Sequence, residues 1–270
     1  MYEVKDKVVL VTGGATGIGA DIVRFFLNEG AKHVAILDID VNTGKAFETE
    51  MNAKYGANRS KFIKCDVTTD DLNTAYEQVL KETGYIDVVV NNAGIMNDSP
   101  NVYLKMIAVN VTALITSSLK AYELMRRDRG GKGGTIINIS SIVALKQFSS
   151  LSVYSGTKSA VQQFSNCLGK EPHYSRSGVR VLSICFGATD TALLTRTKFG
   201  GIDKETDEDF FAALSKLPVQ SSESAARGLV EAYKQGESGS TWLVTTNRPA
   251  EDITNNVQKA YEILGQGVFS

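Results

Sequence analysis

Short apolar runs alternate with longer amphipathic stretches along most of the chain. Runs of this kind lie at residues 8–12, 33–39, 61–65, 86–91, 135–140, 179–186 and 240–246. A short, continuous apolar run is typical of a strand buried on both faces, and strands that alternate with helices form a parallel sheet. We therefore expect an α/β fold, a doubly wound parallel sheet of about seven strands with helices on both faces.

The chain length and the charge limit what such a fold can do. With 270 residues the chain can form a single domain, residues 1–270, that buries a large core. Its 29 basic and 30 acidic residues give a net charge of −1, so no basic surplus indicates a nucleic-acid partner. No apolar run of about eighteen residues could span a membrane, and the first residues lack the features of a signal peptide. We expect a cytoplasmic protein.

The few cysteine and histidine residues do not form a ligand pattern. Cys65, Cys167 and Cys185 each lie in an apolar context, without a CxxC pair or a neighbouring histidine. His33 begins the second expected strand, and we expect it at the surface. The three thiols are therefore predicted to be reduced and structural, and no metal site is expected.

The first expected strand is followed at once by a glycine-rich turn. Gly13, Gly17 and Gly19 separate this strand from a helix that ends near Gly30. Glycines let the backbone approach a ligand, and the free N–H groups of a helix N-terminus favour an anion. This context predicts a phosphate cradle for a dinucleotide. The alternative is a tight turn that binds no ligand.

An acidic side chain closes the second expected strand. Asp38 follows the last glycine of the turn by about twenty residues, the spacing of a carboxylate that accepts hydrogen bonds from an adenosine ribose. Such a carboxylate repels a 2′-phosphate, so Asp38 predicts NAD rather than NADP. Asp40 is the second candidate for this role, and a solvated acid at a strand end is the alternative.

A second group of polar residues follows the fifth expected strand. Ser141 comes directly after that strand, and Tyr154 and Lys158 share one face of an expected helix because they are four residues apart. A phenol has a pKa of about 10, which a nearby cation lowers, so such a tyrosine can act as a general acid or base near neutral pH. Ser141 can donate a hydrogen bond to a substrate oxygen. The alternative is that this spacing is common on any helix.

Two further stretches raise a choice between a structural and a functional interpretation. Residues 100–129 are predicted to form one long helix with Asn110 in its apolar middle, where an amide must find partners. Residues 188–222 are too long for an ordinary connection, and they carry apolar side chains among charges. This segment either covers an apolar substrate or packs on the core. A tail with few apolar residues begins at about residue 247.

Together these motifs resemble the short-chain dehydrogenase/reductase family, whose fold is Rossmann-like. Within the family the chain is most similar to NAD-dependent 15-hydroxyprostaglandin dehydrogenases and insect alcohol dehydrogenases. The matching pieces follow the family order over roughly residues 5–246 and comprise Thr12–Gly19, Asp66-Val67, Asn91–Gly94, Asn110, Ser141, Tyr154–Lys158, and Gly187 with Thr191.

The resemblance implies a role for each matching residue. Tyr154 is the acid/base, and Lys158 lowers its pKa and holds the nicotinamide ribose. Ser141 positions the substrate oxygen, and Asn110 holds a water that links Lys158 to solvent. The implied residues of the NAD site are Gly13, Thr16, Gly17, Ile18, Gly19, Asp38, Asp66, Val67, Asn92, Ala93, Gly94, Tyr154, Lys158, Gly187, Thr189 and Thr191. The family also implies a homodimer or homotetramer, formed through the helices at 100–129 and 151–171.

The chain departs from the family at two positions. Phe186 stands where the family has a proline, which loosens that turn and could present an aromatic ring to the nicotinamide or the substrate. Leu151 stands where prostaglandin dehydrogenases have a glutamine that helps to bind their substrate, which argues against prostaglandin itself. The expected substrate contacts are Met96, Val143, Leu145, Phe148, Leu151, Phe186, Leu193 and the segment 190–217.

The resemblance therefore implies an NAD-dependent oxidoreductase that oxidises a lipophilic or small secondary alcohol to a ketone. One alternative within the class is an insect-type alcohol dehydrogenase or a hydroxysteroid or ecdysteroid dehydrogenase. An NADPH-dependent carbonyl reductase is a further alternative, against which Asp38 argues. The last is a non-catalytic NAD(H)-binding regulatory protein, against which the filled positions Asn110, Ser141, Tyr154 and Lys158 argue.

Overall fold

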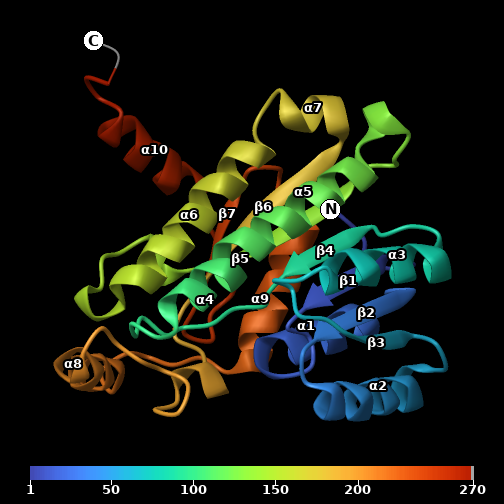
Figure 1. The fold of residues 1–270 in the computed structure, drawn as a ribbon. Coiled ribbons are helices and arrows are strands. Elements are labelled where there is room, and N and C mark those ends of the chain that lie inside the picture. The colour runs from blue at the N-terminus through green and yellow to red at the C-terminus, as the bar shows by residue number, and fades with distance from the viewer. Residues whose placement is uncertain (269–270) are drawn as a thin grey trace.

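A sheet of eight strands forms the centre of the protein (Figure 1). The computed structural model describes residues 1–268. The strands lie in the order β3-β2-β1-β4-β5-β6-β7-β8, and all are parallel except β8. Their bounds are β1 Val8–Thr12, β2 His33–Asp38, β3 Ser60–Lys64, β4 Val88–Asn91, β5 Gly134–Ser141, β6 Val179–Phe186, β7 Thr241–Val244 and β8 Glu251–Asp252. The predicted α/β class and doubly wound parallel sheet are confirmed, and the short antiparallel β8 is an addition.

Successive side chains of the strands enter two separate cores. In β1, Val9 and Val11 belong to one core, whereas Val8 and Leu10 belong to the other. Neighbouring side chains of a strand point to opposite faces, so a continuous apolar run finds apolar contacts on both sides of the sheet. Full burial of each such side chain contributes about 1.5–3 kcal/mol relative to exposure.

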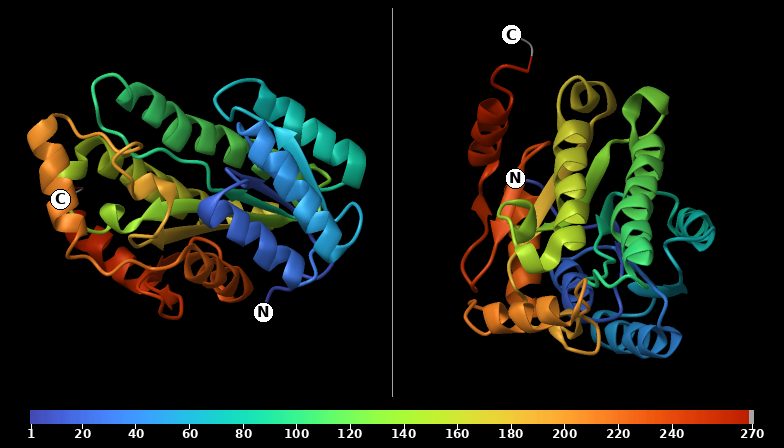
Figure 2. Two further views of the ribbon diagram at one scale, coloured as in Figure 1. Left: turned by 90° about the horizontal axis from the view of Figure 1, so that it is seen from below. Right: turned by 60° about the vertical axis from the view of Figure 1, so that its left-hand side comes forward.

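Helices cover both faces of the sheet, as Figure 2 shows from two directions. The first core receives apolar side chains from α1 (Gly17–Asn28), α2 (Val41–Tyr55) and α9 (Ser222–Gln235). The second core receives them from α3 (Asp71–Thr83), α5 (Leu114–Met125) and α6 (Ser152–Gly169). The remaining α-helices are α4 Tyr103–Ile107, α7 His173–Ser177, α8 Lys204–Leu214 and α10 Thr254–Leu264. In Figure 1, α10 projects away from the sheet toward the C-terminus.

The long helix predicted at residues 100–129 is interrupted in its middle. A π-helix, η1 (Ala108–Ala113), joins α4 to α5, and the 3-10 turn η2 (Arg127–Arg129) follows. The predicted long helical stretch is therefore confirmed over residues 103–125, and the π-helix within it is an addition. A π-helix takes up one extra residue per turn and is frequent at functional sites. Asn110 lies within η1 and is fully buried.

This helical run also meets the length and composition of a membrane span. Residues Tyr103–Met125 have a mean hydropathy of 1.2 over their most apolar window, of which 44% is buried inside the protein. α5 contacts β4 and β5, and its side chains Ala121, Tyr122 and Met125 belong to the second core. These contacts are those of a helix that covers a sheet.

Two side chains lie in surroundings that differ from the prediction. His33 is buried, and its ring Nδ1 lies 2.9 Å from the carbonyl oxygen of Asn58, next to β3. Cys167 is exposed, because it lies on the outer face of α6. Cys65 and Cys185 are buried as predicted, and burial raises the pKa of both thiols to about 12. These two thiols are therefore protonated and unreactive near neutral pH.

The carboxyl ends of the parallel strands meet at one edge of the sheet. The strand order reverses between β1 and β4, and ligands of open α/β sheets bind outside such a reversal point. Residues 188–222, called the covering segment below, cross this edge with the 3-10 turn η5 (Ala192–Leu194) and α8. A bridge between Thr189 and Gln220 joins the two ends of the segment. Two further 3-10 turns, η3 (Ile142–Ala144) and η4 (Ser149–Leu151), link β5 to α6.

Candidate active site

A cavity of about 610 Å³ opens at this edge of the sheet. All sixteen residues that the resemblance assigned to NAD line it, from the glycine turn to Thr191. Ser141 and the predicted substrate contacts Met96, Val143, Phe148, Leu151, Phe186 and Leu193 line it too. The fold therefore brings one continuous pocket together from six segments that are far apart in the sequence, and their assigned roles remain predictions.

The glycine turn after β1 is shaped for a close backbone approach. Gly13 and Gly17 have φ angles of +62° and +53°, which favour glycine. A Cβ atom on Gly19 would lie 2.0 Å from the carbonyl oxygen of Gly13, so only glycine lets α1 start against the turn. Among the described residues, no side chain caps α1 at Thr16. The first N–H groups of the helix are therefore open to an anion, and the turn fits the phosphates of a dinucleotide.

Asp38, and not Asp40, presents its carboxylate to the cavity. Asp38 Oδ2 accepts a hydrogen bond of 3.1 Å from the backbone N–H of Ala15, which holds the acid beside the glycine turn. Asp40 instead caps α2, because its carboxylate accepts hydrogen bonds from the N–H and the hydroxyl of Thr43. These bonds from Thr43 lower the pKa of Asp40.

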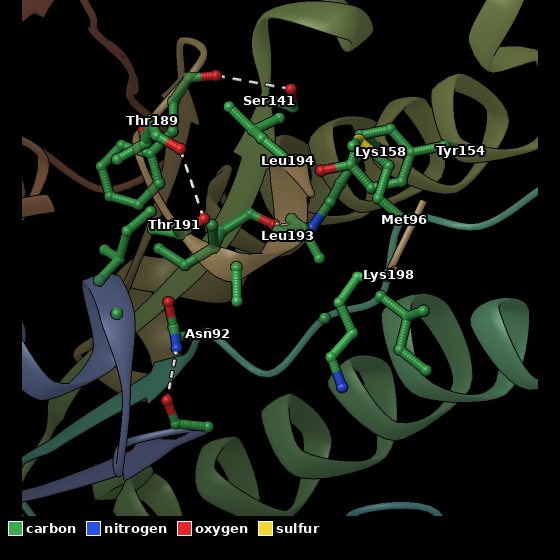
Figure 3. A pocket seen from close by; sticks show the side chains of 18 of the residues that line it. Asn92, Met96, Ser141, Tyr154, Lys158, Thr189, Thr191, Leu193, Leu194 and Lys198 are labelled. Carbon is green, nitrogen blue, oxygen red and sulfur yellow. Dashed lines mark hydrogen bonds between the residues drawn. The ribbon is translucent and has the colours of Figure 1, made fainter. Parts of the chain in front are cut away.

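Asn92 ties the end of β4 to the glycine turn. Its Nδ2 donates hydrogen bonds of 3.0 Å to the carbonyl oxygens of Thr12 and Gly13, one of which is drawn in Figure 3. The hydroxyl oxygen of Thr12 in turn accepts hydrogen bonds from the N–H groups of Asn92 and Ala93. The nitrogen of the Asn92 amide therefore positions the turn, and a contact between this residue and a ribose remains a prediction.

Tyr154, Lys158 and Ser141 converge at the other end of the cavity (Figure 3). Tyr154 and Lys158 lie on α6. Only 7% of the surface of Tyr154 and 4% of that of Lys158 is exposed to solvent. Lys158 Nζ lies 5.7 Å from the centre of the Tyr154 ring and donates a hydrogen bond to the carbonyl oxygen of Ile139. Ser141 Oγ accepts a hydrogen bond from the N–H of Val143. Its own hydrogen is directed at the carbonyl oxygen of Phe186, 3.5 Å away at the limit of a hydrogen bond (Figure 3), so the hydroxyl must turn to donate to a group in the cavity.

Burial decides the protonation of the two α6 side chains in the folded chain. It raises the pKa of Tyr154 to about 12, although a hydrogen bond with Ser141 partly opposes this. It lowers the pKa of Lys158 to about 8. The pKa of Tyr154 in the protein chain therefore lies above its usual value, and a lowering by Lys158 remains a prediction. The reason for both shifts is that burial removes water from both groups, which disfavours the phenolate of Tyr154 and the ammonium of Lys158.

Asn110 lies behind the cavity rather than on its wall. Its Oδ1 accepts a hydrogen bond from the N–H of Ile95, and its Nδ2 donates to the carbonyl oxygen of Ile95, both at 2.8 Å. Nδ2 also lies 3.2 Å from Thr157 Oγ1, on the helix that carries Tyr154. The amide therefore has the backbone partners of the structural interpretation, and its link to a water and Lys158 remains a prediction.

The substrate end of the cavity is apolar and lies under the covering segment. Phe210 of α8 stacks on Phe199, with ring centres 3.9 Å apart, and both are buried. Leu145, a predicted substrate contact, does not line the cavity and is 40% exposed, because it follows η3 and faces solvent. The cavity also includes residues that the prediction did not name singly: Ile39, Cys65, Ile95, Lys105, Leu194, Lys198, Phe210, Ala213, Leu214 and Leu217. For the cavity residues on α8, the sequence signal was the set of apolar side chains in residues 190–217.

Comparisons with known proteins identify relatives of the whole arrangement. Residues 7–199 match the sequence model of a family described as short chain dehydrogenase. The chain is 33% identical to 15-hydroxyprostaglandin dehydrogenase (NAD(+)) of Macaca fascicularis over 71% of each chain. It is 35% identical to alcohol dehydrogenase 1 of Ceratitis cosyra, over 70% of this chain and 73% of the relative.

A solved structure shares the fold. The 3-ketoacyl-(acyl-carrier-protein) reductase from Brucella melitensis, in complex with NADH, matches with a TM-score of 0.75. The match covers 90% of this chain and 98% of the reductase at 22% sequence identity. At this identity the likeness supports the arrangement of strands and helices and carries no argument about the substrate.

Proposed function

The chain belongs to the short-chain dehydrogenase family, and we propose that it oxidises a secondary alcohol to a ketone with NAD as the hydride acceptor. The observation that carries this proposal is the single cavity that joins the glycine turn and Asp38 to Ser141, Tyr154 and Lys158. The names of the relatives, an NAD(+) hydroxyprostaglandin dehydrogenase and an alcohol dehydrogenase, support the same reaction type.

The residues present fit the two ends of the cofactor. Gly13, Gly17 and Gly19 offer open backbone to its phosphates, and the Asp38 carboxylate is placed for the hydroxyls of its adenosine ribose. A 2′-phosphate would face that negative charge, which is why we propose NAD over NADP. When bound, the nicotinamide supplies the hydride acceptor and a positive charge that favours phenolate.

The chain's own side chains handle the proton. Ser141 donates a hydrogen bond to the substrate oxygen, and Tyr154 accepts the hydroxyl proton from that oxygen. Lys158 carries the nearby positive charge that favours the phenolate, and its Nζ is held in place by the carbonyl of Ile139. Because burial raises the pKa of Tyr154, we expect oxidation to accelerate as the pH rises.

The substrate class follows from the wall of the cavity. Met96, Val143, Phe148, Leu151 and Leu193 make its substrate end apolar, so the alcohol should be lipophilic. Lys198 of the covering segment also lines the cavity, and its side chain carries an ammonium group that extends away from Met96 (Figure 3). We propose that this lysine favours alcohols with a distant carboxylate over neutral ones of the same length.

Turnover assays test the proposal directly. NADH or NADPH formation is followed by absorbance with NAD or NADP, across secondary alcohols from small alkanols through hydroxysteroids to long-chain hydroxy acids. We expect turnover with NAD and a preference for the larger apolar alcohols. Preference for NADP, or for ketone reduction by NADPH, would replace the proposal by a carbonyl reductase. Binding of NADH without turnover of any alcohol would favour a non-catalytic role.

We also propose a cytoplasmic homodimer or homotetramer that assembles through α4–α5 and α6. Leu104, Ile107 and Leu119 on the outer face of α4–α5 are exposed apolar side chains, which such an interface would cover. Light scattering after size-exclusion chromatography measures the mass, and Leu119→Lys should shift it toward that of the monomer. A monomeric wild-type protein would contradict this part of the proposal.

A further inference from the structure

Asp98 is a buried acid that lies next to the cavity without lining it. It is 2% exposed and belongs to the loop between β4 and α4. Its Oδ2 accepts a hydrogen bond of 2.7 Å from the N–H of Val153, and its Oδ1 accepts one of 3.0 Å from the N–H of Tyr154. Among the described residues, Leu151 at the start of α6 provides no side-chain cap. Asp98 therefore caps α6 from another segment of the chain.

This cap acts on the turn of α6 that carries Tyr154. A carboxylate that accepts two backbone N–H bonds at a helix N-terminus is held by charge-assisted bonds and by the positive end of the helix. Both bonds lie within one residue of Tyr154, and Lys158 follows one turn later. Asp98 thus holds the backbone of the helical turn from which the phenol of Tyr154 projects.

The neighbouring residue Asn97 faces the covering segment instead. Its Nδ2 donates a hydrogen bond of 3.1 Å to the carbonyl oxygen of Lys198, and the backbone N–H of Asp98 donates to the carbonyl oxygen of Gly200. A Cβ atom on Gly200 would lie 2.6 Å from Asn97 Oδ1, so the two segments are in direct contact. Phe199 lies between these two attachment points and stacks on Phe210 of α8.

Two adjacent residues therefore join the covering segment to the start of α6. We propose that Asp98 is a positioning residue that couples the covering segment to Tyr154, so that the cover and the reacting phenol move together. The inference rests on the proposed dehydrogenase function for its kinetic consequence, but its structural part does not depend on any substrate. Substrate that holds the cover closed would also hold Tyr154 in place for proton transfer.

The test compares wild type with Asp98→Ala and Asp98→Asn. Asp98→Ala leaves both N–H groups of α6 without their acceptor, whereas Asp98→Asn keeps the shape and one acceptor oxygen. The matched control is Asp252→Asn, because Asp252 also accepts a hydrogen bond from a backbone N–H, that of Thr254 at the start of α10. Asp252 does not line the cavity. Hydrogen–deuterium exchange and NADH binding are measured for each variant.

We expect faster exchange in both Asp98 variants at two places, residues 152–156 and residues 196–202, and wild-type exchange there in Asp252→Asn. Faster exchange at residues 152–156 alone would overturn the coupling, and wild-type exchange at both places would overturn the cap. Asp98→Asn provides this measurement even where Asp98→Ala fails to fold. The exchange result stands without turnover, so it is separate from a failure of the proposed function.

The kinetic part uses the alcohol found by the turnover assays. In Asp98→Asn we expect kcat per NADH-binding site to fall by about 10²-fold, the scale of a misplacement of about 1 Å, while NADH binds as in wild type. A loss of folded protein alone would lower the number of NADH sites and leave kcat per site unchanged. That outcome would reduce Asp98 to a stabilising residue.

The pH profile separates the charge of Asp98 from its hydrogen bonds. The charged or titratable groups next to Tyr154 and Lys158 are Asp98 and, on β6, Cys185, and the charged side chains of Lys105 and Lys198 line the same cavity. The Asp98 carboxylate raises the pKa of Tyr154, so the rise of kcat with pH should move to lower pH in Asp98→Asn. An unchanged profile would contradict a direct influence of Asp98 on the phenol.

Discussion

The Nζ atom of Lys158 lies 5.7 Å from the centre of the Tyr154 ring, and both side chains are buried. Their burial moves the two pKa values in opposite directions, to about 12 for the tyrosine and about 8 for the lysine. In both residues, burial favours the neutral form over the charged form. The site is thus built so that an added positive charge has a large effect on the phenol.

Removal of the phenol oxygen tests the role of Tyr154. In Tyr154→Phe we expect alcohol oxidation to fall by about 10²–10⁴-fold, the usual contribution of a positioned acid or base. NADH affinity and thermal stability should stay near wild type, because the ring and its packing are retained. The measurements are steady-state kinetics, NADH titration and calorimetry. Retention of most of the rate would show that another group transfers the proton.

Removal of the buried ammonium should stabilise the protein and inactivate it. Folding lowers the pKa of Lys158 from 10.5 to about 8. The folded state binds this proton more weakly than the unfolded state. Below pH 8 the lysine therefore lowers the free energy of unfolding by its full amount. This destabilising contribution shrinks as the pH rises from 8 and is absent above pH 10.5, where the lysine is neutral in both states.

For Lys158→Met we therefore expect a gain in unfolding free energy of up to about 3 kcal/mol at neutral pH, less the lost hydrogen bond to Ile139. The gain over wild type should shrink toward pH 10.5. Urea unfolding of both proteins across this range provides the comparison, since groups common to both cancel. A lysine variant that is less stable than wild type at neutral pH would contradict this account.

The cofactor preference should depend on Asp38 and not on Asp40. Asp38→Ser removes the negative charge beside the glycine turn, and we expect the ratio of NADP to NAD affinity to rise by about 10-fold or more. Asp40→Ser is the matched control, because serine can still cap α2 and the preference should be unchanged. Titration with NADH and NADPH measures both. A shift in the Asp40 variant alone would exchange the roles of the two acids.

The contribution of Lys198 should depend on the charge of the substrate. In Lys198→Gln we expect kcat/KM for long-chain hydroxy acids to fall by about 5–10-fold, because an exposed ion pair contributes about 1 kcal/mol. The kcat/KM for neutral alcohols should be unchanged. Lys204→Gln at the start of α8 serves as the control, since Lys204 does not line the cavity. Equal losses for acids and neutral alcohols would indicate a packing role for the Lys198 side chain.

Arg180 should stabilise the end of the molecule that lies opposite the cavity. It lies on β6 and is almost fully buried, with its guanidinium carbon 3.4 Å from the centre of the Tyr2 ring. It also donates hydrogen bonds to the carbonyl oxygen of Tyr233 and to Thr135 Oγ1. In Arg180→Lys we expect a loss of about 3 kcal/mol in unfolding free energy, because lysine cannot reproduce the planar fork of donors. Turnover per NADH site should be unchanged, and a large fall in kcat would contradict this separation.

Much of the site follows from local patterns in the sequence. The i, i+4 spacing of Tyr154 and Lys158, the glycines at 13, 17 and 19, and Asp38 at a strand end each specify a local geometry. In a parallel sheet, the ends of neighbouring strands must meet at one edge. For this reason the predicted cofactor residues all line one cavity.

Other features depend on contacts between distant segments. Leu145 could be read as a pocket residue from its apolar neighbours, but the direction of its side chain depends on the turn η3. Asn110 lies in a π-helix, and its amide pairs with the backbone of Ile95 in another segment. The spacing of apolar residues in the sequence cannot predict such a hydrogen-bonded pair, because the two residues belong to different segments.

The sequence by itself determined the order of the elements and which polar side chains stand at the strand ends. Only the tertiary structure decided that Asp98 caps α6, that Asn97 holds the covering segment, and that burial raises the pKa of Tyr154. Local patterns arise from the geometry of a helix or a strand, which a few neighbouring residues specify. Hydrogen bonds between segments and the loss of solvent around a side chain arise only when the whole chain has packed.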